Sequence, residues 1–157
     1  TTVPLDVHLM IVEPEKYVEK FVRAGADYVT IHVEATKTLR ETLQKIRALG
    51  AKCGAVVSPD TPVAALRDCI SLCDMVLLMS VYPGFGGQGY IEASTDRLRA
   101  LKAMRDDLNP AALIEIDGGV HAGNAAMIRA AGADVLVAGS AVFGAKDYAQ
   151  AIKELRG

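Results

Sequence analysis

The sequence lacks several features by which a protein class is often recognised. The 157 residues carry a net charge of only −2, so no basic surface favours nucleic acid as a partner. No apolar run approaches the ~20 residues of a membrane span, and there is no signal peptide, so we expect no membrane partner and a cytoplasmic location. Because the first residue is Thr1 rather than Met, the sequence leaves open whether its natural start lies upstream.

Cysteine is scarce, and its pattern argues against a metal or disulfide framework. Cys53, Cys69 and Cys73 make an odd count without a Cys-x-x-Cys pair. We expect buried free thiols in a reducing cytosol rather than a redox or metal role. Cys69 and Cys73 are four residues apart, so a helix there would place both on one face.

Apolar residues are abundant at 51%, which is ample for the core of one domain spanning 1–157. Short apolar runs predict strands near Leu5–Leu9, Tyr28–Val33, Lys52–Val57, Met75–Ser80, Leu113–Asp117 and Val135–Ala138. The stretches between them predict helices near Pro14–Ala24, Thr38–Leu49, Pro62–Leu72, Ile91–Asp106, Gly123–Ala131 and Lys146–Leu155. Six βα units in a row indicate an α/β parallel architecture, either an open doubly wound sheet or a barrel.

Three glycine-rich turns follow predicted strands, and such turns expose backbone N–H groups to which a phosphate can bind. The longest, after the fourth strand, is Val81-Tyr82-Pro83-Gly84-Phe85-Gly86-Gly87-Gln88-Gly89. The others, after the last two strands, are Asp117-Gly118-Gly119 and Gly139-Ser140-Ala141. In a (β/α)8 barrel the phosphate often lies at the last two loops, so their position favours a barrel, of which this sequence has six units.

The candidates for chemistry in such folds lie at the carboxyl ends of the strands. They are His8, His32, Glu34, Ser58, Met79, Ser80, Asp117 and Ser140. Asp117 ends an apolar strand, where a carboxylate is costly to desolvate unless it is paired, metal-bound or catalytic. His8 shares a strand face with Asp6, and for a lone histidine a structural role stays open beside a functional one.

Four segments resemble the ribulose-phosphate 3-epimerase family, in the order found in that family. They are Asp6-Val7-His8-Leu9-Met10, Met79-Ser80-Val81-Tyr82-Pro83-Gly84-Phe85-Gly86-Gly87-Gln88, Ile116-Asp117-Gly118-Gly119-Val120 and Val137-Ala138-Gly139-Ser140-Ala141-Val142-Phe143. The similarity extends over the whole chain, and Pro-Gly-Phe-Gly-Gly-Gln is specific to this family and to close sugar-phosphate epimerases. The resemblance implies a TIM barrel that interconverts D-ribulose 5-phosphate and D-xylulose 5-phosphate through an enediolate.

The resemblance also implies roles for individual residues. His8 and Asp117 would be ligands of a divalent metal, for which Zn²⁺, Fe²⁺, Mn²⁺ and Co²⁺ are all suitable. Asp117 would also be one of two acid–base carboxylates on opposite faces of the sugar. Met10 and Met79 would line the substrate pocket. The phosphate would bind at Gly84, Phe85, Gly86, Gly87, Gly118, Gly119, Gly139 and Ser140.

Two departures accompany the resemblance. Tyr82 stands where the family usually has Asn. The family's first two βα units, which include a His-x-Asp strand, precede the segment that begins here at Thr2, and this chain contains no His-x-Asp. Because that strand would supply two metal ligands and the second acid–base Asp, we expect weak or no metal binding and little epimerase activity from this chain as it stands. If the units exist upstream, the ordinary enzyme is expected instead.

The same absence would leave the first and last strands without a neighbour, so we expect a homo-oligomer that covers the open edge. Weak binding of a sugar phosphate or of inorganic phosphate is expected to persist, because all three glycine turns are present. Other functions stay open: an epimerase for allulose 6-phosphate, or a non-catalytic phosphate-binding scaffold. A hexulose-phosphate synthase or keto-gulonate-phosphate decarboxylase is disfavoured, since those enzymes have Lys where this chain has His8.

Overall fold

The computed structural model describes residues 1–157 and contains one parallel sheet of six strands. The strands lie in the sheet in the order in which they occur in the sequence. They are β1 (Asp6–Leu9), β2 (Tyr28–His32), β3 (Lys52–Val57), β4 (Met75–Met79), β5 (Leu113–Asp117) and β6 (Val135–Val137). All six predicted strands are therefore present, and each end lies within one residue of its predicted position.

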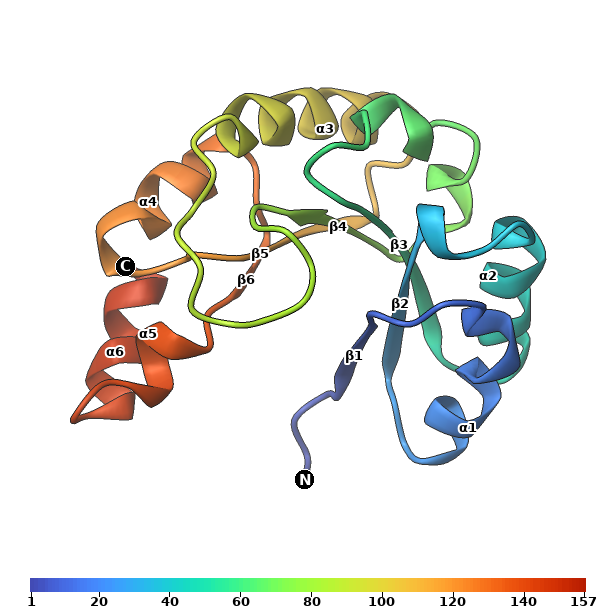
Figure 1. Ribbon diagram of the computed structural model, residues 1–157, viewed down its shortest axis with the longest axis horizontal. Helices are drawn as coiled ribbons and strands as arrows, with labels where there is room; N and C mark the ends of the chain where they lie inside the picture. The colour runs from blue at the N-terminus through green and yellow to red at the C-terminus, as the bar shows by residue number, and fades with distance from the viewer.

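The helices lie outside the sheet, which curves into an arc with its strands on the inner side (Figure 1). They are α1 (Val18–Arg23), α2 (Leu39–Ala48), α3 (Ser94–Leu108), α4 (Ala122–Ala131), α5 (Ser140–Phe143) and α6 (Tyr148–Arg156). Four short 3-10 turns are η1 (Pro14–Lys16), η2 (Val33–Ala35), η3 (Val63–Leu66) and η4 (Ile70–Leu72). No helix combines the length and the apolar character needed to cross a bilayer.

This arrangement decides between the two architectures that the sequence left open. A doubly wound sheet has helices on both faces and reverses its strand order at a switch point. Here the strand order is sequential and the helices cover one face (Figure 1). The fold is therefore a curved, barrel-type sheet, in which β1 pairs only with β2 and β6 only with β5.

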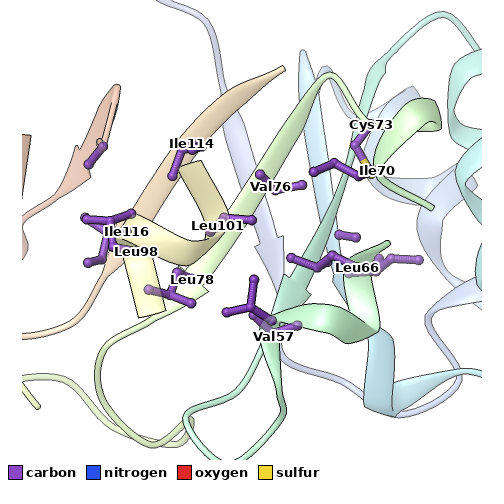
Figure 2. Packing of buried hydrophobic residues seen from close by; sticks show 14 of the residues in the cluster. Val57, Leu66, Ile70, Cys73, Val76, Leu78, Leu98, Leu101, Ile114 and Ile116 are labelled. Atoms are coloured by element: carbon purple, nitrogen blue, oxygen red, sulfur yellow. The ribbon is translucent and has the colours of Figure 1, made fainter. Parts of the chain in front are cut away.

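The main core lies between the convex face of the sheet and the helices, and it comprises 27 buried residues. Figure 2 shows the part where β4, β5 and α3 meet, through Val76, Leu78, Ile114, Ile116, Leu98 and Leu101. Alternate residues of a strand point to opposite faces. A second, small apolar cluster therefore lies on the concave side, formed by Val56, Leu77, Met79 and Val81. Because each buried side chain of this size contributes about 1.5–3 kcal/mol, the outer core dominates the stability of the arc.

The prediction of a helix over Pro62–Leu72 was wrong. The segment instead forms two 3-10 turns, η3 and η4. Asn109 donates from Nδ2 to the carbonyl oxygens of Ile70 and Cys73, at 2.8 and 2.9 Å. Cys69 and Cys73 consequently do not share a helix face, although all three cysteines are buried free thiols, as expected.

Aspartates tie the strands together in pairs at their amino ends. Asp27, Asp74 and Asp134 each precede an even-numbered strand, and each carboxylate accepts the backbone N–H of a residue at the start of the preceding strand. The donors are Leu5, Cys53 and Ile114, at 2.7, 2.9 and 2.8 Å. The backbone N–H of each aspartate donates in return to the carbonyl oxygen of the same residue, so two hydrogen bonds close each pair.

Candidate functional site

Strand alternation places the titratable side chains on the concave face. In β5, Ile114 and Ile116 belong to the outer core, so Glu115 and Asp117 point inward. In β2, Val29 and Ile31 likewise belong to the outer core, which leaves Thr30 and His32 on the inner side. In β1 the same alternation turns Asp6 and His8 inward. Carboxylates and imidazoles thus gather inside the arc.

A cavity of about 290 Å³ lies at the carboxyl ends of β4, β5 and β6. Every residue to which the family resemblance assigns a role lines it, with the exception of His8. The other strand-end candidates, His32, Glu34, Ser58 and Ser80, do not line it. The loop after β4 crosses the open side of the arc in front of β5 and β6 (Figure 1). Three turns that are far apart in the sequence therefore surround one space, with Met79 and Met10 at its wall and Asp117 beside them.

The loop after β4 leaves its amide groups free. Gln88 closes the loop by donating from Nε2 to the carbonyl oxygens of Tyr82 and Phe85, at 2.8 and 2.9 Å. None of the backbone N–H groups of residues 84–87 donates to a protein acceptor. Gly84 and Gly87 have φ of +145° and +79°, a backbone conformation that residues other than glycine rarely adopt. The loop can therefore direct several donors at one anion.

The turn after β5 is packed directly against this loop. A Cβ on Gly119 would lie 2.2 Å from the backbone nitrogen of Tyr90, and Gly119 has φ of +63°. A Cβ on Gly118 would lie 2.5 Å from a methyl group of Val81. A Cβ at either position would force a neighbouring group to move, so glycine allows the two turns to pack closely.

Ser80 fixes the two turns relative to each other. It is fully buried, and its Oγ donates to the carbonyl oxygens of Asp117 and Gly118, at 2.9 and 2.7 Å. Its backbone N–H donates to Asp117, and its carbonyl oxygen accepts from Ile91 at the far end of the loop. The sequence marks Ser80 as a strand-end residue but gives no sign of this bridging role.

The third turn begins α5, a helix that the sequence did not predict. Gly139 is its N-cap, and Ser140 is exposed with no hydrogen bond to its hydroxyl. The backbone N–H of Ser140 donates to no protein acceptor, as is usual in the first turn of a helix. This turn adds a third set of donors to the cavity.

The carboxyl groups of the concave face have raised pKa values. Burial raises the pKa of Asp117. Glu115 is only 3% exposed, and burial followed by the negative charge of Asp6 raises its pKa. Burial also raises the pKa of Asp6, while the neighbouring side chain of Glu115 acts in the opposite direction. One oxygen of Glu115, Oε2, is buried without a hydrogen-bond partner.

His8 does not line the cavity; its ring contacts His32 and Thr30. Its Nε2 lies 3.1 Å from Nε2 of His32, and its Nδ1 lies 3.2 Å from the hydroxyl of Thr30. Burial, and then the charge of His32, lowers the pKa of His8 to about 4, so its imidazole is neutral near pH 7. A neutral imidazole is the form that binds metals.

The donors on the concave face fit a divalent ion in kind but are few. His8 and Asp117 offer an imidazole nitrogen and a carboxylate oxygen, which suit Zn²⁺ and its neighbours. No group of three or more His, Cys, Asp or Glu side chains gathers closely enough to enclose an ion. Catalytic zinc sites usually have three protein ligands, so these two donors alone would bind an ion weakly.

A glycine-lined cavity at the carboxyl ends of a sequential, curved parallel sheet defines a barrel-type βα protein. Solved structures share this fold. A 3-hexulose-6-phosphate synthase is 25% identical at a TM-score of 0.66, covering 93% of this chain and 68% of that one. The 3-keto-L-gulonate-6-phosphate decarboxylase of Vibrio cholerae is 16% identical at a TM-score of 0.72, covering 95% and 68%. Because the decarboxylase is only 16% identical, its similarity shows a shared fold and nothing more.

Comparison of the sequence with known proteins assigns the chain to a particular family. The profile of the ribulose-phosphate 3 epimerase family matches residues 1–143. Ribulose-phosphate 3-epimerase of Aquifex aeolicus is 51% identical over 155 residues, which cover 99% of this chain and 70% of that protein. The Escherichia coli K12 protein of that name is 44% identical, covering 99% and 69%. The chloroplastic ribulose-5-phosphate-3-epimerase of Arabidopsis thaliana is 51% identical, covering 99% and 56%. The chain belongs to the ribulose-phosphate 3-epimerase family.

Proposed function

We propose that this chain carries the sugar-phosphate site of an enzyme that epimerises C3 of a ketopentose phosphate, converting D-ribulose 5-phosphate into D-xylulose 5-phosphate. The observation that carries the proposal is the match of residues 1–143 to the epimerase family, with relatives of that name at 44–51% identity in bacteria and a plant. The cavity supports it, because free amide groups and the half-buried carboxylate of Asp117 line the same space.

The phosphate group binds at the amide-rich end of the cavity. Residues 84–87, Gly118, Gly119, Gly139 and Ser140 supply the backbone donors, and Ser140 adds its hydroxyl. Backbone amides carry no full charge, so the site suits the phosphate as an anchor and leaves the sugar carbons to the side chains at the rim. Met10 and Met79 pack against those carbons.

Asp117 performs one of the two proton transfers. Burial raises its pKa, which brings the carboxylate nearer to the basicity at which proton transfer near neutral pH is most efficient. Inversion at C3 also requires a second group on the opposite face of the sugar, where the family has a His-x-Asp strand. His8 and Asp117 would be two ligands of a divalent ion, and the bound ion would stabilise negative charge on the sugar oxygens.

The six units correspond to part of an eight-unit TIM barrel. The sequential strand order and the outer helices support this assignment, and so do TM-scores of 0.66–0.72 to sugar-phosphate enzymes of similar fold. In such barrels the catalytic groups lie at the carboxyl ends of the strands, where this cavity opens.

Exchange of the C3 hydrogen tests the proposal. The chain is incubated in D₂O with D-ribulose 5-phosphate and Zn²⁺, Mn²⁺ or Co²⁺, and proton NMR follows loss of the C3 signal and formation of D-xylulose 5-phosphate. This readout detects a single proton transfer even where inversion is incomplete. We expect exchange in the wild type and a loss of about 10²–10⁴-fold in Asp117→Asn.

Asp107→Asn is the matched control, because Asp107 is exposed in α3 and forms no ion pair. It should exchange at the wild-type rate. Two results would contradict the proposal. One is a folded chain that binds D-ribulose 5-phosphate without exchange at C3. The other is an Asp117→Asn variant with unchanged exchange.

A further inference from the structure

The middle of the loop after β4 has few contacts with the rest of the protein. An added Cβ on Gly84, Gly86 or Gly87 would meet nothing within 4 Å, so packing does not hold these glycines in place. The hydrogen bonds donated by the side chain of Gln88 remain inside the loop. The position of the free amide groups therefore depends on how residues 82–88 are attached to other elements.

Tyr82 makes the one hydrogen bond that joins residues 82–88 to another element. Its hydroxyl donates to Oδ1 of Asp60, in the loop after β3, at 2.9 Å. No backbone–backbone hydrogen bond involves residues 82–88, and the segment contains no charged side chain that could form an ion pair. Asparagine, the usual residue of the family at position 82, has a shorter side chain, so this contact depends on the tyrosine.

Asp60 belongs to a turn that is itself fixed. The backbone N–H of Thr61 donates to the carbonyl oxygen of Ser58 at 3.1 Å. Arg97 of α3 donates to the carbonyl oxygens of Ser58 and Thr61, both at 2.8 Å. Glu34 of η2 accepts the backbone N–H of Ser58 at 2.9 Å and the hydroxyl of Thr61. Groups from α3 and η2 therefore hold the turn that carries the acceptor of the Tyr82 hydroxyl.

Pro83 and Gln88 connect Tyr82 to the free amide groups. The proline ring fixes φ of Pro83 and confines the preceding Tyr82 to extended backbone conformations. The carbonyl oxygen of Tyr82 accepts from Nε2 of Gln88 at 2.8 Å, and the same nitrogen donates to the carbonyl oxygen of Phe85 at 2.9 Å. A fixed Tyr82 therefore restrains the backbone on both sides of residues 84–87.

We propose that Tyr82 is a positioning residue, whose hydrogen bond to Asp60 holds the amide groups of residues 84–87 at the cavity and so prepares them to bind the phosphate group of the ligand. The assignment rests on the proposed function, in which this loop binds phosphate. When only a fraction of the molecules have a binding loop in place, the apparent affinity falls by that fraction. Loss of the Tyr82–Asp60 bond therefore weakens binding without removing any donor to the phosphate.

Three substitutions separate the hydrogen bond from the charge of Asp60. Tyr82→Phe removes only the hydroxyl, and Asp60→Ala removes the acceptor. Asp60→Asn removes the same charge as Asp60→Ala but keeps an oxygen that can accept from Tyr82. Both positions are exposed, so these substitutions leave the core intact.

Titration with inorganic phosphate, followed by NMR of the amides of residues 84–87, measures the effect. We expect Tyr82→Phe and Asp60→Ala each to bind phosphate about threefold to tenfold more weakly than the wild type, the range for one lost hydrogen bond. Asp60→Asn should bind no more weakly than the wild type. Tyr17→Phe is the matched control and should bind like the wild type, because Tyr17 is 43% exposed and lies between η1 and α1.

The order parameters of the same amides, recorded without phosphate, give a second readout that a purely structural tyrosine would not change. We expect values of about 0.85 in the wild type and in Asp60→Asn, and below about 0.6 in Tyr82→Phe and Asp60→Ala. The double variant Tyr82→Phe/Asp60→Ala should bind phosphate like the Asp60→Ala single variant, because both changes remove the same bond.

Three results would overturn the proposal. They are wild-type phosphate affinity in Tyr82→Phe, rigid loop amides in Tyr82→Phe, and an Asp60→Asn variant that binds as weakly as Asp60→Ala. Failure of the C3 exchange experiment in a chain whose loop amides still bind inorganic phosphate would refute the proposed reaction and leave the role of Tyr82 intact. The two failures are therefore distinguishable.

Discussion

Gly119 is the residue at which two of the glycine-rich turns meet, and its substitution is the most direct test of the proposed anion site. An alanine there would hold a left-handed backbone at φ +63° and place its Cβ 2.2 Å from the Tyr90 nitrogen, so one of the turns must shift. We expect Gly119→Ala to weaken binding of D-ribulose 5-phosphate about tenfold or more, equivalent to about 1.4 kcal/mol, as measured by calorimetry.

Gly89 supplies the control for that substitution. It lies in the loop after β4, where an added Cβ meets nothing within 4 Å and φ is not positive. Gly89→Ala should therefore bind the sugar phosphate like the wild type. Equal weakening by both alanines would show that the loop responds to any substitution and that the close approach at Gly119 has no special part in binding.

Glu34 makes the stability of the fold depend on pH. Its pKa falls from 4.5 to about 2 because hydrogen bonds to its carboxylate outweigh burial. A carboxyl group whose pKa is lower in the folded state contributes stability that is present above the unfolded pKa and is lost as the pH falls through the folded one. We therefore expect Glu34→Gln to lower the urea midpoint near pH 7, and the midpoints of variant and wild type to converge between 4.5 and about 2.

Glu41→Gln is the corresponding control, because Glu41 is exposed in α2 and takes part in no ion pair. It should match the wild type throughout. If Glu34→Gln stayed below the wild type by the same margin in acid as at neutral pH, its effect would come from lost packing and not from the charge of the carboxylate.

At the scale of elements, the paired aspartates predict a graded effect on stability. Asp134 accepts the N–H of Ile114 and also pairs with the buried Arg105 at 3.0 Å, whereas Asp27 accepts the N–H of Leu5 and has no cationic partner. We expect Asp134→Ala to cost about 2 kcal/mol, because it leaves a backbone donor without an acceptor and removes one of the acceptors of Arg105, which keeps those on Asp106 and Ala112. Asp27→Ala should cost about half as much.

Urea denaturation, with equal slopes for the two variants, gives the measurement. The comparison is matched, since both aspartates occupy the same place in their βα units and both substitutions remove the same atoms. Equal losses of unfolding free energy in the two variants would mean that the ion pair between Asp134 and Arg105 adds no stability beyond the hydrogen bond from the Ile114 N–H.

The elements differ in how far the sequence determines them. The strands were predictable because their apolar runs are buried and bounded by turns, and Lys52–Val57 and Leu113–Asp117 match to the residue. The two 3-10 turns over 62–72 were not predictable from local pattern, and their surroundings involve distant residues: Asn109 binds the carbonyl oxygens of Ile70 and, just past the segment, Cys73. The helix α5 spans only Ser140–Phe143, too short for any periodicity to show.

The same distinction applies to the site. The glycine turns could be recognised because positive φ demands glycine locally, whatever surrounds it. The contacts of His32 could not be recognised from the sequence, although the sequence marks His32 as a strand-end residue. They depend on the register that sets β1, β2 and β3 side by side and on the position of α3, and a single sequence does not specify register.

At the scale of the whole molecule, the open arc predicts self-association. β1 and β6 each use one edge for pairing, and the residues that lead into β1 are apolar and exposed, Val3 by 68% and Leu5 by 45%. Unpaired edges with apolar flanks recruit further strands, and a lysine at such an edge opposes this. We propose that the 157-residue chain forms a dimer or larger assembly through the β1 edge, and that Val3→Lys shifts it toward monomer by at least about tenfold in dissociation constant, or about 1.4 kcal/mol.

Sedimentation velocity over a range of concentrations measures that shift, and Val12→Lys provides its control. Val12 is 77% exposed but follows β1 at the opposite end, in the loop toward α1, so it introduces the same charge and removes the same side chain away from the edge. Because the two variants have equal net charge, general repulsion between chains affects both alike. A monomeric wild type would disprove association through the edge, and equal dissociation of both variants would assign the effect to charge and not to the strand that Val3 leads into.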